Sequence, residues 1–165
     1  MTTILESVTI RAEIEAVFDL ICRVEEFPKY ADFLTEVRKI NHKTYRWVAQ
    51  AHGITLSWNA VITECRRPYR LAWRSVRGFQ NSGAYTLTRS PQGTAVSLRI
   101  EYHLPSQFLE ALTLPLADRL TRALAAQILA RVKRKLESEA NQSGTAAPSP
   151  VTSPSNHGYS AQADR

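Results

Sequence analysis

Residues 95–136 read AVSLRIEYHLPSQFLEALTLPLADRLTRALAAQILARVKRKL, and the spacing of their apolar side chains changes part-way along. Up to Leu104 the apolar residues alternate with polar ones, which predicts a β-strand with one apolar face. After Pro115 they recur every four residues, which predicts a long amphipathic helix. The helical stripe comprises Leu116, Leu120, Leu124, Ile128, Val132 and Leu136. A strand and a helix of this kind bury their apolar faces most simply against each other.

Five further strand-like runs precede the strand Ala95–Leu104. They are Glu36–Ile40, Tyr45–Ala51, Ile54–Cys65, Tyr69–Val76 and Gly83–Thr88. The connectors between them are short, polar and rich in turn residues, which favours antiparallel neighbours in a meander. Alternation predicts the inward faces, namely Leu56, Trp58, Ala60 and Ile62, then Tyr69, Leu71 and Trp73, then Val96, Leu98, Ile100, Tyr102 and Leu104.

Ahead of the meander, Ile4–Ile10 alternates as a first strand, and Glu13–Cys22 carries apolar residues at helical spacing. Phe27-Pro28 ends that helix, and Ala31–Leu34 is expected to form a second helical turn. The predicted fold is therefore α+β: a curved antiparallel sheet of six or seven strands wrapped around a long C-terminal helix, with two short helices after the first strand.

The composition fits one globular domain over residues 1–140. Residues 141–165 are mostly Ser, Ala, Pro, Thr, Gly, Asn and Gln, and we expect a disordered tail. The start of the chain has neither the basic nor the apolar region of a signal peptide, and no apolar run reaches spanning length, so a cytoplasmic protein is expected. Cys22 and Cys65 are interpreted as buried thiols.

The chain carries a formal net charge of +6, and its basic residues gather on the predicted terminal helix. They are Arg119, Arg122, Arg131, Lys133, Arg134 and Lys135. Such a cluster can meet an anionic membrane surface or a ribosome, or simply face water. Nucleic acid is disfavoured because no stacking aromatics are interleaved with these residues.

Three stretches of the chain resemble the START-like (SRPBCC) superfamily, and within it the polyketide cyclase/dehydrase and coenzyme Q-binding group. They are Ala16-Val17-Phe18 with Glu26-Phe27-Pro28-Lys29-Tyr30, then Trp58-Asn59-Ala60-Val61-Ile62, then Leu71-Ala72-Trp73-Arg74-Ser75 with Gly78, Asn81 and Gly83. The resemblance covers about residues 3 to 140 and implies the helix-grip fold, which agrees with the predicted order of elements. Members of that superfamily include aromatase/cyclases, lipid and quinone carriers, and ribosome-associated proteins.

Aromatic and leucine side chains on the inward faces are the candidate ligand-binding residues. They are Phe27, Tyr30, Phe33, Leu56, Trp58, Trp73, Phe79, Asn81, Tyr85, Tyr102, Phe108, Leu112, Leu116, Leu120 and Leu124. Phe27, Tyr30, Phe33, Phe79 and Phe108 are expected at the mouth of the cavity. No catalytic constellation, metal motif or nucleotide-binding loop is present in the sequence, so no catalytic residue, metal or cofactor is predicted.

The sequence thus predicts a binder of a small hydrophobic molecule, such as a quinone, a lipid or a polyketide-like compound, held between sheet and helix. Two alternatives remain open. One is a polyketide aromatase/cyclase, in which Arg74, Ser75, Asn81, Tyr85 and Tyr102 could guide the chemistry, although alternation places Arg74 on the solvent side. The other is a protein that docks on a ribosome or membrane through its basic helix.

Overall fold

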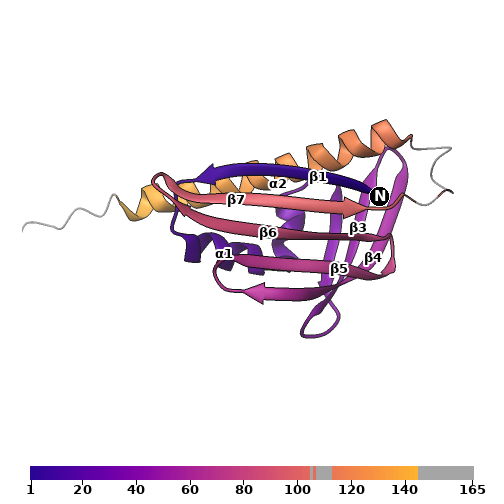
Figure 1. The fold of residues 1–165 in the computed structure, drawn as a ribbon, viewed down its shortest axis with the longest axis horizontal. Coiled ribbons are helices and arrows are strands. Elements are labelled where there is room, and N and C mark those ends of the chain that lie inside the picture. The colour runs from indigo at the N-terminus through magenta and orange to yellow at the C-terminus, as the bar shows by residue number, and fades with distance from the viewer. Residues whose placement is uncertain (105, 107–112, 145–165) are drawn as a thin grey trace, which may run out of the picture.

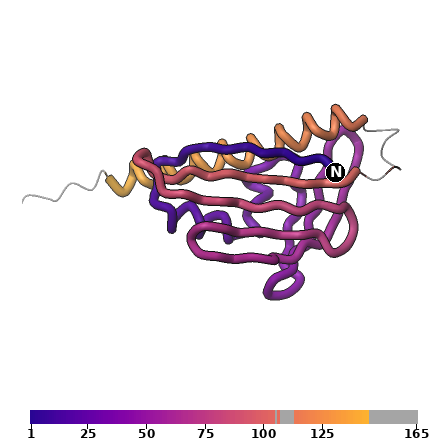
Figure 2. Tube along the Cα trace, viewed as in Figure 1, coloured from indigo at the N-terminus to yellow at the C-terminus, as the bar shows by residue number. Residues whose placement is uncertain are grey.

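A computed structural model describes residues 1–104, 106 and 113–144 of the chain. The elements are β1 (Thr2–Ile10), α1 (Ile14–Cys22), the 3₁₀ helix η1 (Val24–Lys29), β2 (Leu34–Lys39), β3 (Thr44–Ala51), β4 (Ile54–Arg66), β5 (Arg70–Gly78), β6 (Asn81–Ser90), β7 (Gly93–Tyr102) and α2 (Leu114–Ser143). The tube trace shows that the N-terminus lies beside the end of β7 (Figure 2), where Thr2 pairs with Tyr102.

All seven described strands form one antiparallel sheet in the order β1-β7-β6-β5-β4-β3-β2. The sheet bends strongly, because the pairing of β4 with β5 shifts register twice, between Asn59 and Ala60 and between Ile62 and Glu64. Consequently β3 and β4 run steeply across the direction of β6 and β7, and α2 extends along the sheet (Figure 1). The predicted fold, a curved antiparallel sheet around a long C-terminal helix, is confirmed.

Two local predictions are wrong. The second helical segment is η1 at Val24–Lys29, with Pro28 inside it, and Ala31–Leu34 leads directly into β2. A short 3₁₀ helix tolerates this proline better than a continuing α-helix does. Tyr69 precedes β5 and is 42% exposed, and its ring lies under the Arg89 guanidinium.

Helix α2 begins after Thr113, with Pro115 in its first turn, and continues to Ser143, three residues beyond the predicted end of the domain. Its buried residues are Ala117, Ala125, Ile128, Leu129, Val132 and Leu136. Phe108 and Leu112, and most of the predicted tail, lie outside the described residues. Within the described ranges, no helix is both long and apolar enough to cross a membrane.

The loop before β2 is anchored to α2 through Asp32. The Arg131 guanidinium donates to both carboxylate oxygens of Asp32, at 2.8 and 3.0 Å, and Gln127 exchanges two further hydrogen bonds with the same residue. The Arg131 and Gln127 hydrogen bonds hold the pKa of Asp32 below its ordinary value. This network fixes one end of the sheet against the middle of the helix.

The two cysteines differ in their environments, and the prediction that both are buried is wrong. Cys65 is exposed, whereas Cys22 is partly buried against the core. Burial raises the pKa of the Cys22 thiol to about 11, and the neighbouring Cys65 thiol contributes to the rise.

Alkylation at pH 8 is therefore expected to modify Cys65 first. Only about one Cys22 thiol in a thousand is ionised at that pH, because the pKa lies about three units higher and the thiolate is the reactive form. Peptide mass spectrometry after brief iodoacetamide treatment should find a single adduct, on Cys65. Adducts at Cys22 should appear only near pH 11 or in denaturant. Equal labelling of both thiols at pH 8 would contradict the burial of Cys22.

Candidate ligand cavity

A cavity of about 160 Å³ lies between the inner face of the sheet and α2. Its lining residues are Ile21, Val24, Phe27, Leu34, Tyr45, Trp47, Ala49, Leu56, Trp58, Ala60, Ile62, Leu71, Trp73, Phe79, Asn81, Tyr85, Leu98, Ile100, Tyr102, Leu104, Ala117, Thr121, Leu124 and Ile128. A 150 Å³ apolar cavity in another protein holds a benzene molecule, so this one has room for a ring-sized group.

Nine of the fifteen candidate residues named from the sequence line this cavity. They are Phe27, Leu56, Trp58, Trp73, Phe79, Asn81, Tyr85, Tyr102 and Leu124. Tyr30 and Phe33 lie outside the lining; Tyr30 is buried behind Phe27, and its hydroxyl lies 3.3 Å from a Glu26 carboxylate oxygen. Phe108 and Leu112 belong to the residues that the structure does not describe.

Leu116 and Leu120 also lie outside the lining, although both belong to the predicted helical stripe. They pack beside a small cluster formed by Ile4, Tyr102, Leu104 and Ala117. The α2 residues that border the cavity instead include Ala117 and Thr121, one turn apart. Their small side chains leave a space that leucines at the same positions would fill.

Strand β3 contributes three lining residues that were not predicted: Tyr45, Trp47 and Ala49. They alternate with Arg46, Val48 and Gln50, so the period-two signal was present in the sequence. Trp47 and Trp58 pair directly across β3 and β4, and their rings stack with centroids 5.9 Å apart and an 8° angle between planes. All three tryptophans of the chain therefore face the cavity.

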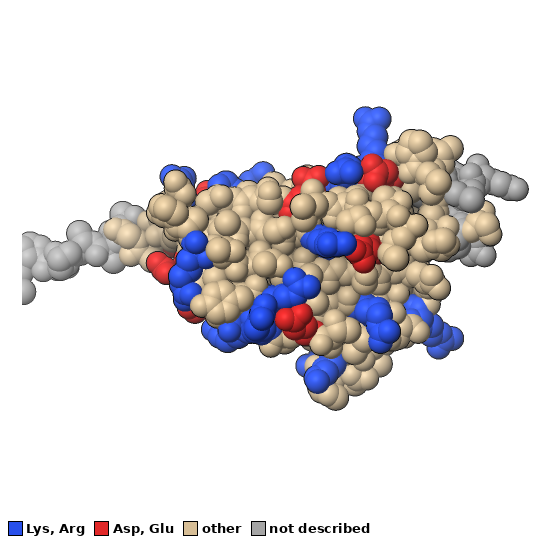
Figure 3. All heavy atoms as spheres, in the orientation of Figure 1, with Lys and Arg blue, Asp and Glu red and all other residues tan. Residues whose placement is uncertain are grey.

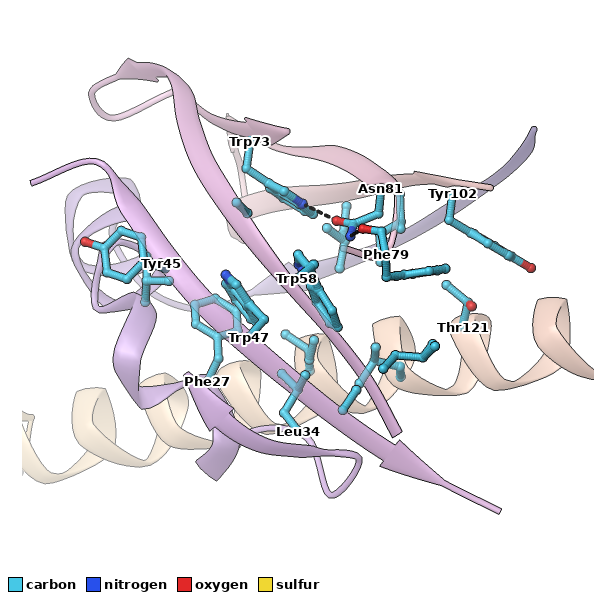
Figure 4. A pocket seen from close by; sticks show the side chains of 18 of the residues that line it. Phe27, Leu34, Tyr45, Trp47, Trp58, Trp73, Phe79, Asn81, Tyr102 and Thr121 are labelled. Carbon is cyan, nitrogen blue, oxygen red and sulfur yellow. Dashed lines mark hydrogen bonds between the residues drawn. The ribbon is translucent and has the colours of Figure 1, made fainter. Parts of the chain in front are cut away.

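Aromatic rings follow one another around much of the cavity wall. From Phe27 the contacts run through Trp47 and Trp58 to Phe79, with centroid separations of 5.8 to 5.9 Å. On the other side, Phe27 contacts Tyr85 at 6.0 Å, and Tyr85 contacts Trp73 at 5.8 Å. Figure 4 shows several of these rings turned toward the space above α2. A wall of this kind suits a flat, apolar guest.

Asn81 joins the two ends of this aromatic series. The Trp73 indole N–H donates to Asn81 Oδ1 at 3.1 Å, and Asn81 Nδ2 donates to the Phe79 carbonyl at 3.0 Å (Figure 4). Gly83 lies directly opposite Trp73, and a Cβ there would come within 2.4 Å of the indole ring. The glycine thus allows the Trp73 ring to lie across β6.

Gly78 positions the neighbouring Phe79. Its φ of +82° is a conformation that side chains with a Cβ rarely adopt. It turns the end of β5 so that the Phe79 amide donates to the Ser57 carbonyl at 3.1 Å. The Phe79 ring then contacts both Trp58 and Tyr102.

A model of the family "Polyketide cyclase / dehydrase and lipid transport" matches residues 10–129 of the chain. The chain belongs to this family. The matched region contains α1, β2 to β7 and the part of α2 that borders the cavity. The resemblance noted in the sequence is thereby confirmed.

Solved structures share the fold, and a curated protein is similar in sequence. TTHA0849 from Thermus thermophilus is 20% identical, with a TM-score of 0.75 over 84% of this chain and 99% of that one. DR_A0006 from Deinococcus radiodurans is 30% identical, with a TM-score of 0.57 over 78% and 99%. An uncharacterized 17.2 kDa protein of Streptomyces lincolnensis is 24% identical over 62% of this chain and 70% of its own length.

The Zhui aromatase/cyclase from a Streptomyces species shares the fold, with a TM-score of 0.62, 14% identity and coverage of 87% of this chain and 98% of that one. The description of the family, which names polyketide cyclases/dehydrases and lipid transport, agrees with a cavity lined mainly by apolar side chains. Arg74, considered above as a polar group for such chemistry, is exposed on the outer face. Among the described residues, no group of His, Cys, Asp and Glu is arranged to hold a metal ion.

The basic side chains of α2 are largely engaged with carboxylates of the same molecule. Their partners are Glu6 and Asp118 for Arg122, Asp32 for Arg131, Glu137 for Lys133 and Glu139 for Lys135. On the face of the molecule shown in Figure 3, basic side chains lie in separate places, several of them beside acidic ones. Much of the positive charge is therefore compensated locally.

Proposed function

We propose that the protein binds a small, flat hydrophobic molecule, such as a quinone or a polyketide-like aromatic compound, in the cavity between the sheet and α2. The observation that carries this proposal is the aromatic wall, in which Trp47, Trp58 and Trp73 all face one ring-sized space. Ring faces and edges attract one another beyond the gain from burial alone, so a ring gains more from this wall than a saturated chain does.

Catalysis is the second candidate, and the family description favours it. An aromatase/cyclase holds a flexible poly-ketone chain in one reactive geometry, with a few polar groups that move protons. The polar side chains at this cavity are Asn81, Tyr85, Tyr102 and Thr121, together with Tyr45, and none of the described lining residues is charged. General acid–base catalysis is most efficient with a group whose pKa lies near neutral pH, and burial raises the pKa of each of these three tyrosines instead. Binding without turnover therefore agrees better with this lining.

Tryptophan fluorescence tests the binding proposal directly, because all three tryptophans face the cavity. Ubiquinone-1, a substituted benzoquinone with one short prenyl chain, is expected to quench the fluorescence with saturation. Palmitate, a saturated chain with a carboxylate, is expected to bind at least about tenfold more weakly, because it gains no ring contacts and brings a charge into an uncharged cavity. An excess of palmitate should therefore not displace the quinone.

Quenching that rises linearly without saturation would count against the proposed binding site. Tighter binding of palmitate than of the quinone would instead favour a lipid carrier. Contact of α2 with an anionic membrane stays a prediction, and flotation with phosphatidylserine vesicles tests it.

A further inference from the structure

Tyr85 occupies a central position in the cavity wall. It lies on β6, directly opposite Leu71 on one neighbouring strand and Leu98 on the other, and all three side chains line the cavity. Only 5% of Tyr85 is exposed. Its ring contacts the rings of Phe27 and Trp73, with centroids 6.0 and 5.8 Å away. The side chain is therefore fixed in direction as well as buried.

The hydroxyl of Tyr85 has no hydrogen-bond partner among the residues that the structure describes, unlike the hydroxyls of Tyr30 and Tyr69. Tyr30 pairs with Glu26, and the Tyr69 hydroxyl accepts a bond of 2.8 Å from Arg89. A buried donor without an acceptor costs about 1–3 kcal/mol.

The Tyr85 oxygen also differs from that of Tyr102. Within the described ranges, the side-chain polar atoms that are completely enclosed and unpaired are Ser90 Oγ and the Tyr102 hydroxyl. Tyr85 is not among them, so its unpaired oxygen is not fully enclosed by protein atoms, and the Tyr85 side chain lines the cavity. An O–H group in this position is available to a ligand without any rearrangement of the wall.

The surroundings of Tyr85 also limit the charge of the ligand. Burial alone raises the pKa of Tyr85 far above its ordinary value, so the hydroxyl stays protonated and acts as a donor. None of the described residues that line the cavity is basic. A buried carboxylate or phosphate would therefore lack a counter-charge, which is far more costly than burying a ketone.

Building on the proposed function, we propose that Tyr85 orients the ligand by donating its O–H to an uncharged oxygen of the ligand. The cavity then selects a ring that carries a ketone or quinone carbonyl over a ring of the same shape that carries a carboxylate. Tyr85 is a specificity-determining residue in this account, and the aromatic wall supplies most of the affinity.

Three single-ring compounds of nearly equal size test this proposal: acetophenone, benzoate and ethylbenzene. Each is titrated into the full-length protein at pH 7.5 and followed by amide chemical shifts in NMR spectra. The wild type is expected to bind acetophenone at least about thirtyfold more tightly than benzoate, because the carboxylate is charged at that pH. Tyr85→Phe is expected to weaken acetophenone binding about fivefold and to leave ethylbenzene binding unchanged or tighter.

Tyr69→Phe removes the same atom from an exposed tyrosine and should change none of these affinities. Unchanged acetophenone binding in Tyr85→Phe, or an equal loss for acetophenone and ethylbenzene, would overturn the role of Tyr85 and leave the proposed function in place. Benzoate binding as tight as that of acetophenone would overturn the selection against charge. A wild type that binds none of the three rings would instead overturn the proposed function itself.

Discussion

Ala60→Phe is expected to abolish ligand binding while the protein remains folded. Ala60 is 2% exposed on the inner face of β4, between Trp58 and Ile62, and its side chain borders the cavity. A phenyl ring at this position would extend from the cavity wall into the space of about 160 Å³. The affinity for ubiquinone-1, measured by calorimetry, should fall at least about a hundredfold, whereas overpacking should cost no more than about 3 kcal/mol of stability.

Val61→Phe is the matched control, because alternation places Val61 on the opposite face of the same strand. This variant should bind the quinone as the wild type does. If folded Ala60→Phe kept full affinity, the ligand would have to bind somewhere other than the cavity.

Gly78→Ala is expected to destabilise the protein by about 3 kcal/mol, the sum of two costs. One cost is the positive φ of +82°, which an alanine adopts with strain. The other is steric, because a Cβ at Gly78 would lie 2.2 Å from the Ser57 carbonyl oxygen and 3.0 Å from Trp58 Cα. Both contacts are with backbone, which cannot move aside without disturbing the pairing of β4 with β5.

Gly53→Ala separates the two costs, because Gly53 has a similar φ of +76° and a Cβ added there would meet nothing within 4 Å. Urea unfolding should therefore show a loss of only about 1 kcal/mol in that variant. Equal losses at Gly53 and Gly78 would mean that the close approach to Ser57 does not restrict residue 78.

The fold was predictable from the sequence because its elements have clear periods. Residues such as Leu98 and Ile100 alternate cleanly, and Ile128, Val132 and Leu136 recur at helical spacing and are buried as expected. The prediction was wrong at Tyr69, because the alternating pattern begins one residue before Arg70, the first residue of β5. Alternation alone does not mark where a turn ends, and the ring of Tyr69 finds a partner in Arg89 outside the sheet.

The cavity was less predictable, because it depends on where side chains are small. The leucine stripe of α2 drew attention to Leu116 and Leu120, yet Ala117 and Thr121 border the space. Packing against the sheet decides how a helix is rotated about its own axis. Apolar residues spaced every four positions drift around the helix, so their spacing alone does not determine which residues face the cavity. Trp47 could have been found from its alternation with Arg46 and Val48, whereas its stacking on Trp58 depends on the register of β3 and β4.

A crystal structure of the protein with ubiquinone-1 tests the central claim most directly. We predict that the quinone ring lies between the aromatic wall and α2, in contact with Trp58 and Thr121, with a carbonyl oxygen toward Tyr85. A quinone bound only on the outer face of the sheet, with the side chains of the inner face and α2 closed upon one another, would contradict the claim.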